Sequence, residues 1–379
     1  MERVLFLHPS DEQYGADRVL RTAAVGMRAR GHDVRVLLAD DSAPGWLSSQ
    51  LAADGIEVRR GPLAPARRRY LHPAGLPGYV AALWRARRWI RREAEALDAT
   101  VIHVNTSALL AVALIRRRGG PRLIWHVHEI VVSPRPLAWL FRAIPVRRSD
   151  RVIAISRAVA DHLGPAPAGR IIVLYNGVEA SDSAEQEVDL PGRRPRVGFI
   201  GRLNRWKGYE VFVEAATILA QRHSETDFVL IGSAPPGEEG RLLDLRAGIE
   251  RAGLGGRIFA IGHHPLADRA YGGLDVVAVP STWPEPFGLV IVEAMRAGVA
   301  VVATRHGAAP ELIDDGVTGL LVPPGDAAAL ADAIAALLDD PRRRRRLATA
   351  ARVAARERFT VARFLDGLEA IYAGEGGPP

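Results

Sequence analysis

The sequence predicts an α/β protein built from two successive Rossmann-like domains. Short apolar, β-branched runs such as residues 3–8 and 196–200 are typical of buried parallel strands. Each run is followed by a glycine-containing loop and a helical pattern, the order that opens a Rossmann-like unit. The chain has 379 residues, which favours two or three domains. A polar stretch without periodicity separates the halves, so we expect domains over 1–178 and 196–355, joined by a linker over 179–195.

Composition indicates an ordinary globular protein of a reducing compartment. Charged residues make up 25% of the chain and apolar residues 48%. The chain has no cysteine, which excludes disulfides and thiolate metal sites. No apolar run approaches the roughly 20 residues needed to span a bilayer, and the first residues enter a strand directly, without a signal peptide. We therefore expect a cytoplasmic location, with peripheral attachment to the inner face of the membrane as an alternative.

Basic residues are concentrated in the first half of the chain. The formal net charge is +7, and the whole excess lies within residues 1–190. The segment from Trp84 to Arg92 combines tryptophans with many arginines. This pattern fits either a solvated helix or a helix resting on an anionic lipid surface, and both interpretations stay open. No nucleic-acid-binding motif is present, so we expect no nucleic-acid partner.

Polar side chains follow the predicted strands of the first half. Gly15 lies between the first strand and a helical run, where it serves either a helix-entry turn or a ligand contact. Two later strands end in Asn105 and in His128-Glu129. Period-two alternation puts His126 and His128 on one face of their strand, with His128 nearer its end. A structural role stays open for both histidines, and a turn-forming role for Asn105.

The second half opens with a strand and a basic, glycine-bounded loop. Gly201 and Gly208 allow sharp backbone turns, and Arg202 and Lys207 extend from the loop between them. Arginine grips phosphate oxygens in a fork, whereas lysine acts as a compact charge. Of the 50 basic residues, Lys207 is the only lysine. The loop therefore predicts an anion site.

The stretch over residues 281–298 carries the densest set of functional signals. It follows an apolar run at 275–280, and the prolines on either side of Glu285 keep that carboxylate on a loop. A helical pattern begins near Leu289 and stops at Gly298. Ligands of open α/β sheets bind at such strand ends, where helix N-termini attract anions and carboxylates accept hydrogen bonds from hydroxyls. A nucleotide sugar carries phosphate groups next to hydroxyl groups, so this stretch predicts a nucleotide-sugar site.

These motifs resemble those of the retaining GT-B glycosyltransferases of family 4. The resemblance rests on Glu285 and Glu293 with seven residues between them, on the Pro-Phe-Gly of that interval, and on the Gly-Arg-Leu…Lys-Gly run that ends at Gly208. It covers nearly the whole chain. The family usually has two adjacent glycines where this chain has Tyr14-Gly15. The resemblance implies a GT-B fold, with two domains facing across a cleft and a helix over 356–373 returning to the first domain.

The resemblance also implies roles for individual residues. The groups expected to contact the donor nucleotide are Gly15, Arg202, Lys207, Gly262, His263, Phe287, Gly288, Leu289 and Glu293. Within this set, the diphosphate would be held by Arg202, Lys207 and the amides at Gly288 and Leu289. Glu293 would hold the ribose. Glu285 and His128 would contact the donor sugar.

The implied reaction is retaining transfer of a sugar from a nucleoside diphosphate to a hydroxyl acceptor. No cofactor or metal is expected, because the family generally works without one. A lipid-linked or envelope acceptor and a soluble natural product both stay open. Two alternative functions also remain: a nucleotide-sugar epimerase of the same fold, and a non-catalytic nucleotide-sugar-binding protein. A phosphorylase of this fold would need a lysine for pyridoxal phosphate, and the only lysine, Lys207, already has a phosphate-binding role.

Overall fold

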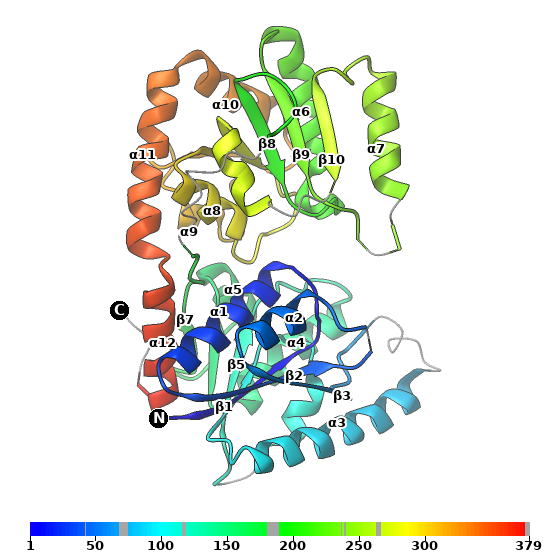
Figure 1. Cartoon of the computed structure of the whole chain (residues 1–379), viewed down its shortest axis with the longest axis vertical. Coiled ribbons are helices and arrows are strands. Elements are labelled where there is room, and N and C mark those ends of the chain that lie inside the picture. The colour runs from blue at the N-terminus through cyan, green and yellow to red at the C-terminus, as the bar shows by residue number, and fades with distance from the viewer. Residues whose placement is uncertain are drawn as a thin grey trace. The chain divides into compact units, whose positions relative to one another are not determined.

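The chain folds into two compact units (Figure 1). The first contains residues 1–177 and the segment that begins at Val361, and the second contains residues 178–360. The computed structural model describes residues 1–41, 43–67, 75–115, 119–179, 189–235, 237–238, 240–262 and 267–375. Each unit has one fully parallel sheet, which confirms the predicted pair of Rossmann-like domains.

The first unit is organised around a seven-stranded sheet in the order β3-β2-β1-β4-β5-β6-β7. The strands are β1 (Arg3–His8), β2 (Asp33–Ala39), β3 (Glu57–Gly61), β4 (Val101–Val104), β5 (Arg122–Val127), β6 (Arg151–Ala154) and β7 (Ile171–Val173). The central strands are almost entirely buried, as expected when helices cover both faces of a parallel sheet. The connecting helices are α1 (Gly15–Ala29), α2 (Trp46–Ala53), α3 (Leu76–Ala96), η3 (Leu110–Leu114), α4 (Arg135–Arg148) and α5 (Arg157–Leu163).

The second unit repeats this plan with a six-stranded sheet in the order β10-β9-β8-β11-β12-β13. Its strands are β8 (Arg196–Ile200), β9 (Asp227–Ile231), β10 (Ile258–Gly262), β11 (Val276–Val279), β12 (Ala300–Thr304) and β13 (Leu320–Val322). Its helices are η5 (Arg205–Lys207), α6 (Tyr209–Arg222), α7 (Gly240–Arg251), η6 (Ala267–Gly273), α8 (Leu289–Ala297), α9 (Ala309–Leu312), α10 (Ala327–Asp339) and α11 (Pro341–Arg358).

The strand orders fix where each unit can bind a ligand. In the first sheet the direction of winding reverses between β1 and β4, and in the second between β8 and β11. Ligands of open α/β sheets bind beyond the carboxyl ends of strands at such a reversal. His8 and Asn105 lie there in the first unit, and Arg202 and Ser281 lie there in the second.

Two predicted boundaries differ from the structure. The predicted linker ran to Pro195, but Leu190 is buried and the Arg193 amide donates to Asp227 at 2.6 Å. The described end of the linker, residues 189–195, therefore packs as part of the second unit. The predicted helix over 356–373 is two helices, because Phe359 leaves the helical conformation and buries its ring 6.1 Å from that of Phe287.

The last helix, α12 (Val361–Ala373), packs within the first unit. Arg30 donates to Asp366 at 2.7 Å and to Glu369 at 2.5 Å. The hydroxyl of Tyr372 lies 2.6 Å from Nδ1 of His103, and both side chains are fully buried. A buried polar pair of this kind fixes the helix in one position, because any shift of the helix would leave both buried groups without a hydrogen-bond partner.

Burial keeps the His103 imidazole neutral. Its pKa falls from 6.5 to about 3, mainly because burial penalises the charged form and secondarily because of His128. The unfolded chain binds this proton near pH 6.5, whereas the folded chain does not bind it until about pH 3. Stability is therefore full above pH 6.5 and is lost as the pH falls through this window.

We predict that the free energy of unfolding falls by about 1.4 kcal/mol per pH unit for each such histidine below pH 6. Urea denaturation at several pH values measures this slope. The variant His103→Leu should show a smaller slope, lower by the contribution of one proton, because the titrating group is gone. Tyr372→Phe is the control, since it removes the hydrogen bond and keeps the imidazole. Equal slopes in the wild type and His103→Leu would contradict the assignment.

Candidate functional site

The loop between β11 and α8 forms the centre of the site in the second unit. Glu285 lies on this loop, and α8 begins at Leu289 and ends before Gly298, as the sequence predicted. Gly288 precedes the helix with φ of 93°, a left-handed conformation that favours glycine. The Gly288 carbonyl accepts the Ile291 amide at 2.9 Å, so the amides of Leu289 and Val290 are the ones at the start of α8 for which the helix itself supplies no carbonyl.

Glu285 and Lys207 form a two-pronged ion pair. Lys207 Nζ lies 2.8 Å from one carboxylate oxygen of Glu285 and 2.7 Å from the other. The hydroxyl of Ser281 also donates to Glu285, at 3.0 Å. Because Glu285 is only 7% exposed, its charge needs these partners. The structure thus joins two residues to which the resemblance gave different parts of the donor, the diphosphate and the sugar.

Close backbone approaches hold the Lys207 and Glu285 loops together. Gly208 has φ of 74°, and a Cβ placed on it would lie 1.9 Å from the Pro280 carbonyl oxygen. A Cβ on Gly307 would lie 2.4 Å from the backbone nitrogen and oxygen of Glu285. Neither position accepts a side chain, so glycine is required for the loops to meet.

The other predicted donor residues lie on neighbouring strand ends. Arg202 is half-buried directly after Gly201, whose amide donates to β9 at 2.9 Å. Gly262 closes β10, and its carbonyl accepts the Gly232 amide at 2.7 Å. Phe287 is 3% exposed, and its ring lies 6.1 Å from that of Phe359. His263 lies outside the described residues.

Glu293 is oriented by a residue that the sequence did not indicate. The hydroxyl of Tyr271 donates to one carboxylate oxygen of Glu293 at 2.6 Å. Tyr271 comes from η6, 22 residues earlier in the chain, and carries no motif that would have identified it. Ser281 had a visible signal, because it is a hydroxyl residue directly after a predicted strand.

In the first unit, His128 belongs to a buried polar network. Its Nε2 lies 2.8 Å from Oδ1 of Asn105, and its ring centroid lies 4.2 Å from that of His126. Nδ1 of His126 is 3.2 Å from Nε2 of His103, so His126 faces the core. Burial lowers the pKa of His126 and His128 well below the usual range, with a further contribution from neighbouring histidines. Both rings are therefore neutral.

Gly15 is the first residue of α1 and adjoins the same network. The carboxylate of Asp17, in the first turn of this helix, accepts from the amides of Glu12 and Tyr14, both at 3.2 Å. His8 Nε2 contacts Asp17 at 3.1 Å. Neither Asp17 nor His8 is among the predicted site residues, although His8 ends a predicted strand.

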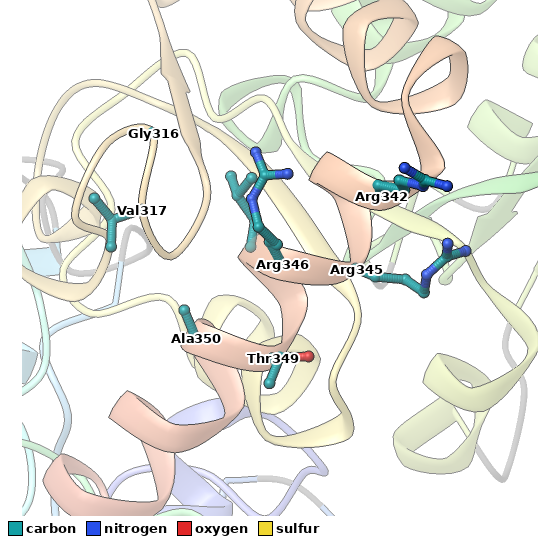
Figure 2. Close-up of a pocket in the computed structure, with 8 residues that line it drawn as sticks. Gly316, Val317, Arg342, Arg345, Arg346, Thr349 and Ala350 are labelled. Atoms are coloured by element: carbon teal, nitrogen blue, oxygen red, sulfur yellow. The ribbon is translucent and has the colours of Figure 1, made fainter.

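A separate hollow of 690 Å³ lies beside α11 (Figure 2). It is lined by Gly316, Val317, Arg342, Arg345, Arg346, Leu347, Thr349 and Ala350. The three arginines are exposed, as expected for the solvated charge run predicted there. None of the eight residues is a predicted site residue. Across the described ranges, no group of three or more histidine and carboxylate side chains is placed to hold a metal ion.

Comparisons with known proteins agree with this architecture. Residues 181–354 match the family model of glycosyl transferases group 1, and residues 14–182 match that of glycosyltransferase family 4. The D-inositol 3-phosphate glycosyltransferase of Arthrobacter sp. (strain FB24) is 31% identical over 364 residues, which are 88% of this chain and 83% of the relative.

Another relative and a solved structure extend the similarity. The lipopolysaccharide core biosynthesis mannosyltransferase LpsB of Rhizobium meliloti (strain 1021) is 31% identical over 60% of this chain and 66% of its own length, just under two thirds. The crystal structure of Anabaena Alr3699/HepE in complex with UDP-glucose has a TM-score of 0.80 and 27% identity, covering 99% of this chain and all of that one. The two parallel sheets, the loop that carries Glu285 and these similarities show that the chain belongs to glycosyltransferase family 4, the group 1 glycosyltransferases of the GT-B fold.

Proposed function

We propose that the protein is a retaining, metal-independent glycosyltransferase that moves a sugar from a nucleoside diphosphate to a hydroxyl acceptor. The observation that carries this proposal is the pairing of Lys207 with Glu285 beside the N-terminus of α8. A cation, a carboxylate and free helix amides at one strand end suit a diphosphate linked to a polyol. Arg202 adds a second cation beyond β8.

In the proposed mechanism, positive charge stabilises the departing diphosphate. Negative charge accumulates on the phosphate oxygens as the sugar–oxygen bond breaks, and Arg202, Lys207 and the α8 amides gain their strongest interaction at that stage. These groups supply the charge that a metal ion provides in other enzymes. Glu285 accepts hydrogen bonds from the sugar hydroxyls, and Glu293, held by Tyr271, accepts them from the ribose.

The proposed donor is a uridine diphosphate sugar. The support is the similarity to Anabaena Alr3699/HepE, whose structures contain UDP and UDP-glucose. A donor phosphate oxygen takes the acceptor proton while the acceptor attacks the face that the diphosphate leaves. The new bond then keeps the configuration of the old one.

The proposed acceptor is lipid-linked and is reached at an anionic membrane surface. Leu76, Val80 and Trp84 are each about half exposed and follow one another at four-residue spacing on α3. The helix that carries this stripe, α3, is drawn in light blue (Figure 1), and Arg85 and Arg88 of the same helix are exposed. An apolar stripe with flanking arginines suits a helix lying in an anionic lipid interface. None of the described helices is long and apolar enough to cross a bilayer.

We predict that Lys207→Ala lowers kcat/KM by about 100-fold or more, because one charge contact to the diphosphate is lost. The thermal shift caused by UDP should also disappear, and chelator should not change the shift in the wild type. Arg345→Ala is the matched control, since it removes an exposed cation of the same unit that lines only the hollow beside α11. Near-normal turnover and UDP binding in Lys207→Ala would remove the proposed donor site.

We predict that the product has the anomeric configuration of the donor. The proton coupling constants of the new glycosidic bond, followed by nuclear magnetic resonance during the reaction, report the configuration before any later isomerisation. An inverted product would exclude the same-face mechanism and leave the donor site intact.

We predict that the double variant Val80→Glu, Trp84→Glu binds vesicles of phosphatidylcholine and phosphatidylglycerol about 10-fold more weakly than the wild type. The reason is the lost burial of two apolar side chains in the interface. Vesicle flotation measures the bound fraction. Leu243→Glu, on α7 and 65% exposed, is the control. Equal flotation of wild type and double variant would favour a soluble acceptor.

A further inference from the structure

One continuous hydrogen-bonded chain leads from the first turn of α1 to His128. Asp17 Oδ1 lies 3.1 Å from His8 Nε2, and His8 Nδ1 lies 3.1 Å from Asn105 Nδ2. Asn105 Oδ1 lies 2.8 Å from His128 Nε2. All four side chains are buried, and they come from four segments: β1, α1 and the ends of β4 and β5.

The Ala16 carbonyl determines which way the Asn105 amide is turned, and therefore which atom donates in each hydrogen bond. Asn105 Nδ2 lies 3.1 Å from this oxygen, which can only accept a hydrogen bond. The amide nitrogen of Asn105 must therefore be on this side, and its oxygen must face His128. Since the Asn105 oxygen only accepts, His128 Nε2 must carry the proton of that bond.

The other end of the chain agrees with this direction. The second hydrogen of the Asn105 amide points to His8 Nδ1, which accepts it, so the His8 proton is on Nε2 and faces Asp17. Burial alone would raise the pKa of Asp17, but hydrogen bonds from His8, Glu12 and Ser10 bring it below its usual value. A fixed carboxylate thus ends the chain.

With its proton on Nε2, the neutral ring of His128 has a lone pair on Nδ1. Nδ1 has no hydrogen-bond partner in the described part of the chain. Nε2 of His126 is a fully buried atom without a hydrogen-bond partner, but Nδ1 of His128 is not fully buried. His128 as a whole is 9% exposed. His128 therefore offers one accessible nitrogen that accepts a hydrogen bond and cannot donate one.

We propose that Asp17, His8 and Asn105 are positioning residues that hold His128 as the Nε2–H tautomer, so that Nδ1 accepts a hydrogen bond from a sugar hydroxyl. This inference rests on the proposed function, together with the contact between His128 and the donor sugar that the family resemblance implies. It adds a rule of specificity. The group that meets His128 must be a hydroxyl that donates, and a fluorine or methoxy group at the same position cannot replace it.

The tautomer is measured directly by long-range nitrogen–proton correlation spectra of the protein labelled with ¹⁵N-histidine, with His128→Gln used to assign the signal. We expect His128 in the wild type to carry its proton on Nε2 alone. In Asn105→Leu the acceptor for the Nε2 proton of His128 is lost, so both tautomers should appear. His8→Gln should keep the wild-type spectrum, because its amide presents one acceptor and one donor as a neutral imidazole does. His162→Leu, which removes another histidine of the first unit, is the control.

Kinetics then test the consequence for substrate choice. Among donor sugars and acceptors fluorinated at one hydroxyl at a time, we expect one position to lose about 10-fold or more in kcat/KM for the wild type, the cost of one missing hydrogen bond. Asn105→Leu should lose most of this discrimination, and His8→Gln should keep it. Discrimination that is equal in wild type and Asn105→Leu would overturn the inference.

The two proposals fail in different ways. A His128 proton on Nδ1 in the wild type, or a tautomer that does not respond to Asn105→Leu, would overturn the positioning role even in an active enzyme. This spectrum of the wild type does not depend on whether a variant folds. Absence of sugar transfer with every nucleoside diphosphate sugar would instead overturn the proposed function.

Discussion

The contact of Lys207 with both oxygens of Glu285 is the interaction on which the arrangement of the second unit's loops depends. A carboxylate that is 7% exposed is costly unless a cation and hydrogen-bond donors neutralise it. Lys207 and Ser281 meet this need only if the loops after β8 and β11 touch. Gly208 follows from this constraint, because a side chain there would collide with the Pro280 carbonyl; Gly307, in the loop after β12, likewise leaves room for the backbone of Glu285.

In the first unit, the side chains that contact His128 are the neutral groups of Asn105 and His126. Parallel strands β1, β4 and β5 bring polar side chains to one buried edge of the sheet. Neutral histidines and an asparagine pass one hydrogen bond to the next, and a carboxylate ends the series. Because such bonds have a direction, each group fixes the protonation of its neighbour. One unit thus offers fixed charges suited to an anion, and the other offers oriented neutral groups suited to hydroxyls.

Much of the fold could be predicted because its signals are local. Buried parallel strands appear as apolar runs, and helix stops such as Gly298 need a left-handed residue. The predicted helix over 356–373 failed because periodicity cannot show which core receives each side chain. Phe359 packs in the second unit and Phe364 in the first, so the helix is interrupted between them.

The sequence by itself determined the two α/β units, the loop position of Glu285, the helix start at Leu289 and the family. These features depend on residue type and short spacing, which the chain order contains. Only the tertiary structure decided that Lys207 pairs with Glu285, that Tyr271 holds Glu293, and that Asp17 is linked to His128 through His8 and Asn105. Such contacts join residues 9 to 97 positions apart, and their geometry is set by sheet order and burial. Neither is visible in the spacing of residues along the chain.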